Sequence, residues 1–151
     1  MVRASYTADA GKGLRLSEIC IWDICIFNYL IGNTDNHIKN VSLLYDPNMI
    51  SVRSAPAYNI VSTLIYPGST TDMAFAIGNK YDIHRISRED FRSEAENVGM
   101  GDKVAMKHYD YFADKLEGAL KKSCEKLMEQ GFVQAEDIRN RIRDKRKDAL
   151  A

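Results

Sequence analysis

Blocks of apolar and polar residues along the chain predict a mainly helical domain. The stretch Leu14–Ile31 has apolar residues on nearly every face, as expected for a helix buried inside a larger body. Gly32 is expected to end this helix, because glycine breaks helical patterns. Residues 1–13 are small and polar and are expected to form a flexible N-terminal segment ahead of a single domain at residues 14–151.

The next apolar runs are short and predict a β-hairpin over residues 41–54. Val41–Tyr45 and Ile50–Arg53 are rich in apolar residues and are separated by a turn at Pro47. Pro56 then predicts a loop, because proline cannot donate to a sheet ladder and disfavours a helical residue before it. Tyr66–Lys80 is expected to be an irregular surface loop that ends in a short apolar run.

Helical signals dominate residues 87–150. Ser87 as N-cap with Asp90 at N3 predicts a helix to about Val98. A longer helix is expected over Asp102–Gln130, ended by Gly131, and a last one over Ala135–Leu150. The predicted fold class is therefore α+β, mainly α with one small β-hairpin.

Charge and cysteine content narrow the classes of function. Lysine plus arginine equal aspartate plus glutamate at 21 each, with six of each up to Lys80 and fifteen of each beyond it. This balance does not indicate a nucleic-acid or membrane surface, so direct nucleic-acid binding and membrane partners are not expected. The three cysteines form no Cys-x-x-Cys pair and are expected to be reduced and buried in a cytoplasmic protein.

The polar loop at residues 32–40 carries the candidate chemistry. It places Asp35 five residues before Asn40, between the buried helix and the hairpin. This is the spacing of a phosphoryl-transfer catalytic loop, in which the Asp accepts a proton from the attacking hydroxyl and the Asn binds a metal ion. Polar residues between two buried elements are well placed for chemistry.

Two segments resemble the HipA-like C-terminal kinase domain. They are Phe27–Asn40, FNYLIGNTDNHIKN, and Ala55–Ser62, APAYNIVS. The resemblance implies a kinase C-lobe-like helical domain from a family of bacterial serine/threonine kinases, many of them toxins of toxin–antitoxin pairs. The catalytic loops of that family look more like those of phosphoinositide 3-kinases than those of ordinary protein kinases.

The resemblance also implies roles for individual residues, with Mg²⁺ and ATP as cofactors. Asp35 would be the catalytic base and Asn40 a Mg²⁺ ligand. His37 would either steady the transferring phosphoryl group or hold the loop shape, and Lys39 would either assist it or extend into solvent. The metal segment at residues 55–63 carries Asn59 where the family has an Asp. An amide lacks the charge of a carboxylate, so weaker binding of metal and nucleotide is expected.

Two functional interpretations remain open. The chain contains no N-lobe with a glycine-rich cover and strand lysine, so it could be a kinase C-lobe that acts on a protein substrate only when an N-lobe partner completes the cleft. Alternatively, it could be a degenerate pseudokinase that binds an antitoxin-like protein. The basic residues near the C-terminus are interleaved with acidic ones, which favours an amphipathic surface helix over a DNA-binding segment.

Overall fold

The computed structural model describes residues 11–48, 50 and 52–150, so most of the predicted flexible segment at residues 1–13 lies outside the described residues. Helices make up most of the chain, together with two small antiparallel hairpins, and the α+β prediction is confirmed. The helices are α1 (Gly11–Ile31), α2 (Arg88–Asn97), α3 (Asp102–Glu129), α4 (Ala135–Lys145) and α5 (Lys147–Leu150). Short 3₁₀ turns, η2 (Ile38–Asn40) and η3 (Thr63–Ile65), lie in the loops.

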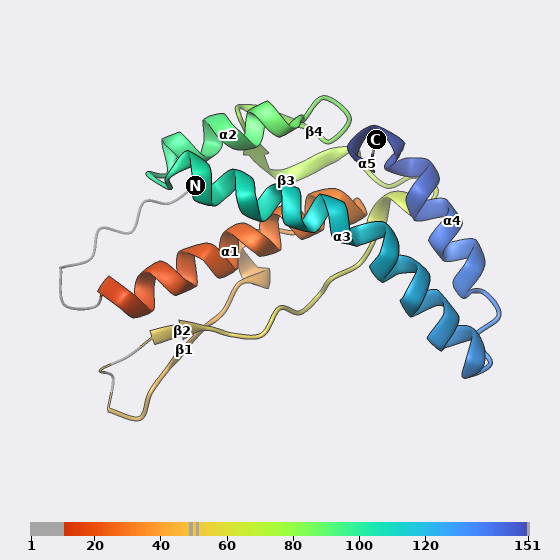
Figure 1. Ribbon diagram of the computed structural model, residues 1–151, viewed down its shortest axis with the longest axis horizontal. Coiled ribbons are helices and arrows are strands. Elements are labelled where there is room, and N and C mark those ends of the chain that lie inside the picture. The colour runs from red at the N-terminus through yellow and green to blue at the C-terminus, as the bar shows by residue number, and fades with distance from the viewer. Residues whose placement is uncertain (1–10, 49, 51, 151) are drawn as a thin grey trace.

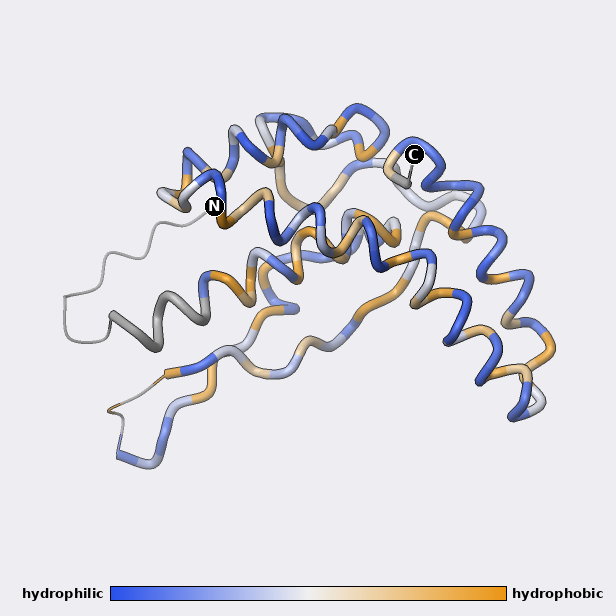
Figure 2. The backbone as a smooth tube through the Cα atoms, in the orientation of Figure 1, coloured by the Kyte–Doolittle hydropathy of each residue, from blue (hydrophilic) through white to orange (hydrophobic). Residues whose placement is uncertain are grey.

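Helix α1 is the centre of the molecule (Figure 1). It packs against α3 and against the strand β2, while α2 and α4 each pack on α3. Figure 2 shows many hydrophobic residues in the C-terminal part of α1. This part supplies Trp22, Ile26, Tyr29 and Leu30 to the core, each at most 3% exposed. The all-round apolar pattern of the sequence therefore reflects a helix that is covered on several sides.

Aromatic side chains join three helices in the core. The Phe91 ring of α2 lies 5.0 Å from the ring centroids of both Tyr29 in α1 and Tyr109 in α3. The polar ends of the aromatic residues are also satisfied, since the Trp22 indole N–H donates to the carbonyl of Ala105 and the Tyr29 hydroxyl donates to that of Ile86. These contacts fix the C-terminal end of α1, from which the polar loop begins.

The first hairpin matches the prediction for residues 41–54. Strands β1 (Leu43–Tyr45) and β2 (Val52–Ser54) pair antiparallel with Leu44 opposite Arg53. All three residues of β1 are exposed, although they are apolar. Figure 1 shows this hairpin at the edge of the molecule, beside α1, which packs against β2.

A second hairpin stands where the sequence predicted an irregular loop. Strands β3 (Asp72–Ile77) and β4 (Lys80–Asp82) are joined by Gly78 and Asn79, which both have positive φ angles, 56° and 63°. A two-residue turn with positive φ at both positions matches the right-handed twist of paired strands. The prediction weighed the apolar run alone and missed this turn signal.

The helix ends follow local chemistry, and the predicted stops at Gly32, near Val98 and at Gly131 are confirmed. Asp90 accepts hydrogen bonds from the Ser87 amide and hydroxyl at the start of α2. At the end of α3, Gly131 has a φ of 89° and its amide donates to the Met128 carbonyl, while the Phe132 amide donates to Leu127, as in a Schellman cap. The predicted single helix to Leu150 is instead interrupted at Arg146, between α4 and α5.

Arg146 lies at this interruption. Its side chain is 1% exposed, and its guanidinium carbon lies 4.5 Å from the centre of the Tyr29 ring. Its backbone is non-helical, with a φ of −119° and a ψ of 20°. Three other basic residues, Arg139, Arg141 and Arg143, make ion pairs with Glu117 or Asp137, which agrees with the amphipathic interpretation of this helix.

Smaller expectations also differ from the structure. Cys25 and Cys124 are buried and free as predicted, but Cys20 is exposed. Burial raises the pKa of the Cys25 thiol to about 12, so this thiol stays protonated and unreactive. His108 is part-buried, and its Nδ1 atom lies 2.7 Å from an Asp23 oxygen. No helix in the described part of the chain has the length and hydropathy needed to cross a bilayer.

Candidate functional site

The polar loop begins where Gly32 ends α1. Gly32 has a φ of 76°, a conformation that favours glycine. A Cβ atom at this position would lie 3.0 Å from Leu64 and 3.1 Å from the Arg146 side chain. The Gly32 carbonyl accepts hydrogen bonds from the Leu64 amide and the Thr63 hydroxyl. The first residue of the loop is therefore held by both the η3 segment and the C-terminal helices.

Two threonines, the buried Thr34 and the half-buried Thr63, connect the loop to η3. The Thr34 amide and hydroxyl each lie 2.8 Å from the Thr63 hydroxyl oxygen, and the Thr34 carbonyl accepts from the Ala74 amide in β3. Ser62 donates its hydroxyl hydrogen to the Ile31 carbonyl. Ser62 and Thr63 thus each bond to a residue 31 positions earlier, Ile31 at the end of α1 and Gly32 at the start of the loop.

Asp35 combines a fixed backbone with an exposed carboxylate. Its amide donates to the Asn33 side-chain oxygen at 3.2 Å, and its carbonyl accepts from the His37 amide and the Asn40 side chain, both at 2.9 Å. Its side chain is 65% exposed. The loop thus presents a carboxylate to solvent from a backbone that three hydrogen bonds hold in place.

His37 and Lys39 lie on the same loop with different surroundings. The Nε2 atom of His37 is 4.0 Å from a carboxylate oxygen of Asp35, at the outer limit of an ion pair. Its Nδ1 atom is buried and has no hydrogen-bond partner among the described residues. Lys39 has an exposed side chain and makes no ion pair within the described part of the chain, while its carbonyl accepts from the Tyr58 hydroxyl.

Asn40 and Asn59 meet although they are 19 residues apart. The Asn59 side-chain N–H₂ donates to the Asn40 side-chain oxygen at 3.2 Å. Asn40 is 8% exposed and lies in η2, whereas Asn59 is exposed and has a φ of 53°. This left-handed conformation is several-fold enriched in Asn and Asp among residues with a side chain. The metal segment predicted at Asn59 therefore does reach the loop at Asn40.

A second buried amide connects these groups to α1. Asn33 donates its side-chain N–H₂ to the Asn28 side-chain oxygen at 2.6 Å and to the Asn59 carbonyl at 3.2 Å. Asn28 donates in turn to the Ile24 carbonyl. The sequence analysis did not single out Asn28 or Asn33, although two carboxamides five residues apart at the end of an apolar helix were a visible signal.

The donor set determines what metal could bind. Within the described chain, no three His, Cys, Asp or Glu side chains cluster around a possible ion. Asn40 and Asn59 could each supply an amide oxygen, but at present one donates to the other. These residues fit a Mg²⁺ ion that takes most of its ligands from nucleotide phosphates and water. They do not form a cage that would hold Mg²⁺ without a nucleotide.

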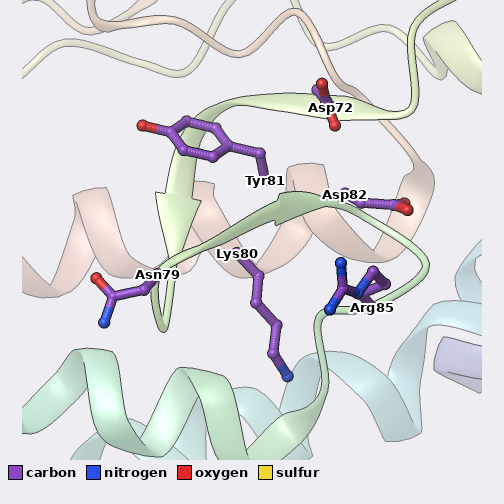
Figure 3. Close-up of a pocket in the computed structure, with 6 residues that line it drawn as sticks. All are labelled: Asp72, Asn79, Lys80, Tyr81, Asp82 and Arg85. Carbon is purple, nitrogen blue, oxygen red and sulfur yellow. The ribbon is translucent and has the colours of Figure 1, made fainter.

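A shallow hollow of about 310 Å³ lies elsewhere, on the second hairpin (Figure 3). Its lining is charged, and in Figure 3 Lys80 points from β4 toward α2, where its ammonium is 2.8 Å from Asp90. None of the loop residues discussed above lines this hollow. Its residues are Asp72, Asn79, Lys80, Tyr81, Asp82 and Arg85.

Two curated proteins of Sinorhizobium fredii (strain NBRC 101917 / NGR234) are similar in sequence to this chain. The one named "Putative kinase Y4mE" is 35% identical over 79 residues, which is 52% of this chain and 18% of that protein. The one named "Putative kinase Y4dM" is 28% identical over 81 residues, 54% of this chain and 20% of that protein. The matched part of the chain spans about a fifth of the length of these relatives.

The fold is also similar to a solved structure. A chain in the complex of HipA, HipB and operator DNA from the Shewanella oneidensis MR-1 toxin–antitoxin system superposes with a TM-score of 0.66. The match covers 86% of this chain and 29% of that chain at 20% identity, which shows a shared fold.

The profile of one domain family extends over most of the chain. It matches residues 9–130, which include α1, the polar loop, both hairpins, α2 and α3. Because this match exceeds half of the sequence, the chain belongs to the family of HipA-like C-terminal domains.

Proposed function

We propose that this chain is the catalytic-loop lobe of an ATP-dependent serine/threonine kinase, which transfers a phosphoryl group from Mg-ATP to a hydroxyl of a protein. The observation that carries the proposal is the convergence of the polar loop with the metal segment at Asn40 and Asn59, beside an exposed carboxylate at Asp35. Similarity to proteins named as kinases supports the same class of reaction.

Each loop residue has a task in this proposal. Asp35 accepts the proton of the substrate hydroxyl, which its exposure permits and its fixed backbone directs. Asn40 and Asn59 offer amide oxygens to Mg²⁺, which when bound neutralises charge on the nucleotide phosphates. His37 is half-buried, its Nδ1 atom has no partner among the described residues, and it would steady the transferring phosphoryl group or hold the loop shape. Lys39 extends into solvent.

The lobe is expected to be weak or inactive alone. Among the residues that the structure describes, no N-lobe surface covers the loop, and β1 exposes Leu43, Leu44 and Tyr45 beside it. Asn59 also supplies no negative charge to offset the dehydration of Mg²⁺. An N-lobe, in the same polypeptide or in a partner, would cover this apolar hairpin and close the nucleotide cleft.

A second candidate function is that of a binding module without catalysis, for an antitoxin-like protein. The observation that favours it is the hydrogen bond from Asn59 to Asn40, because this bond uses the Asn40 oxygen that a metal would need. Under this alternative the same amides stabilise the loop and bind no metal.

Phosphoryl transfer distinguishes the two candidates. Transfer of labelled phosphate from ATP to a model protein should appear when this chain is completed by a related N-lobe, and Asp35→Asn should lower kcat by roughly 10²- to 10⁴-fold. The matched control is Asp114→Asn, which removes another exposed carboxylate in α3 and should leave the rate unchanged. Stable folding and protein binding without transfer by the completed wild type would support the binding module instead.

A further inference from the structure

Four hydrogen bonds around the loop form a closed ring. The Asp35 amide donates to the Asn33 side chain, which donates to the Asn59 carbonyl. The Asn59 side chain donates to the Asn40 side chain, and Asn40 donates back to the Asp35 carbonyl. The ring therefore passes through the proposed base and both proposed metal ligands, with Asn33 as the one member that has no proposed contact with the reacting groups.

Asn33 is suited to this place by its chemistry. A carboxamide offers two N–H donors and one oxygen acceptor. Asn33 uses both donors, one to Asn28 and one to Asn59, and uses its oxygen for the Asp35 amide. The side chain is 1% exposed, so water cannot replace a lost partner and a lost bond leaves a buried polar group unsatisfied.

Asn28 anchors the ring to the core. It is fully buried in α1, accepts from Asn33 at 2.6 Å, and donates to the Ile24 carbonyl at 2.8 Å. This side chain shares a bond with the ring without being a member of it. At the far side, Asn59 has the left-handed φ of 53°, and the bond from Asn33 to its carbonyl holds that conformation.

We infer that Asn33, anchored by Asn28, is a positioning residue that sets the spacing between the base Asp35 and the metal segment at Asn59. The inference rests on the proposed function for its catalytic meaning. One buried amide holds the backbone of both segments, so the base and the metal-binding amides keep a fixed separation and their geometry is prepared before substrate binds.

Three substitutions separate the bonds of Asn33. Asn33→Asp keeps an oxygen acceptor for the Asp35 amide but removes both donors. Asn33→Ala removes all three side-chain bonds of Asn33, and it serves as the second variant where Asn33→Asp does not fold. The control, Asn28→Asp, makes the same chemical change at an equally buried position. It keeps an acceptor for Asn33 and leaves the four bonds of the ring intact.

The first readout is NMR of the full 151-residue chain without nucleotide. Asn33→Asp should shift the side-chain amide signals of Asn40 and Asn59 while the Asp35 amide keeps its hydrogen-exchange protection. Asn33→Ala, which also removes the acceptor, should speed exchange of the Asp35 amide by about tenfold. Asn28→Asp should lower Tm but leave the Asn40 and Asn59 signals in place. A merely structural role for Asn33 would make all signals change in proportion to Tm.

The second readout is steady-state kinetics of the kinase completed with an N-lobe. Asn33→Asp should lower kcat by at least about tenfold with little change in KM for the protein substrate. Unshifted Asn40 and Asn59 signals in Asn33→Asp, or equal shifts in Asn28→Asp, would overturn the inference. Because the NMR readout needs no catalysis, it tests the ring even where the wild type transfers no phosphate, a result that would count against the proposed function alone.

Discussion

At the scale of single residues, the candidate site depends on carboxamides more than on charges. Asn40 and Asn59 occupy the two proposed metal positions, and the only carboxylate among the proposed site residues is that of Asp35. An amide oxygen is a weaker Mg²⁺ ligand than a carboxylate, because it brings no charge to replace lost hydration. The residue type at position 59 should therefore control affinity for metal and nucleotide.

Asn59→Asp tests this dependence. The substitution keeps a residue that tolerates the observed φ of 53°, so the backbone should be retained. Without metal, the new carboxylate faces the Asn40 oxygen and Tm should fall slightly. With Mg-ATP and a completing N-lobe, the added charge should tighten nucleotide binding about tenfold, or about 1.4 kcal/mol. Calorimetric titration of the wild type and of Asn59→Asp with ATP, with and without Mg²⁺, measures this change in nucleotide affinity. Equal affinities of the two proteins for Mg-ATP would contradict the prediction.

At the scale of secondary-structure elements, the second hairpin is held to α2 by a tight contact at its turn. The Gly78 amide donates to Glu94, and a Cβ atom on Gly78 would lie 2.7 Å from the Asp90 Cβ atom. Lys80 and Ser87 both donate to Asp90. Since β3 also donates to the Thr34 carbonyl, this contact supports one side of the catalytic loop.

Gly78→Ala should therefore destabilise the protein. Both the positive φ of 56° and the backbone contact at Asp90 oppose a methyl group, and we expect a loss of about 2 kcal/mol or more in the free energy of unfolding. The matched control is Gly118→Ala in α3, where a Cβ atom meets nothing within 4 Å and helix propensity should add about 0.5–1 kcal/mol. Urea denaturation measures the free energy of unfolding of both variants. Equal effects of the two substitutions would show that the contact between Gly78 and Asp90 does not limit the side chain at position 78.

Asp90 should make this region sensitive to acid. Burial opposes its ionisation, but hydrogen bonds from Lys80 and Ser87 outweigh burial and hold the pKa of Asp90 below the ordinary value of 3.8. A carboxylate with a depressed folded-state pKa contributes stability that is complete above the ordinary value and is lost as pH falls through the folded value. Below about pH 4, Asp90→Asn should thus lose stability less steeply than the wild type. Parallel curves of unfolding free energy against pH would exclude this role.

At the scale of the whole molecule, Arg146 joins the C-terminus to the start of the catalytic loop. Its side chain packs over Tyr29 in α1 and lies beside Gly32, while its backbone separates α4 from α5. Its Nε and Nη2 atoms are buried without a hydrogen-bond partner among the described residues. The contact therefore combines a favourable cation–π interaction with a desolvation cost.

Truncation and replacement of Arg146 should have different effects. Arg146→Ala opens a cavity in the core and should cost about 3 kcal/mol. Arg146→Met keeps an apolar stem against the Tyr29 ring and removes the desolvated charge, so its cost should stay within about 1 kcal/mol. Arg141→Ala, which removes an exposed ion pair in α4, serves as the surface control. Equal losses in Arg146→Met and Arg146→Ala would show that the charge itself is essential.

The difference between local and long-range signals explains which features the sequence could predict. The Ser87 cap, the Gly131 stop and the first hairpin depend on neighbouring residues, and all three were predicted. The spacing of Asp35 and Asn40 also lies within one loop. Contacts between distant segments were not predictable, because nothing local marks Thr63 as a partner of Thr34, or Arg146 as a partner of Tyr29. The assigned roles in phosphoryl transfer stay predictions.

The most direct test of the central claim is paramagnetic NMR with Mn²⁺-ATP, since Mn²⁺ accepts the oxygen ligands that Mg²⁺ prefers. The measurement uses the labelled full chain with an added N-lobe, and Mn²⁺ without nucleotide is the control. Binding of Mn²⁺-ATP should selectively broaden the signals of Asp35, Asn40 and Asn59, while Mn²⁺ alone should leave them sharp. Unbroadened loop signals, with broadening confined to acidic surfaces such as Asp72 and Asp82, would contradict the proposed site.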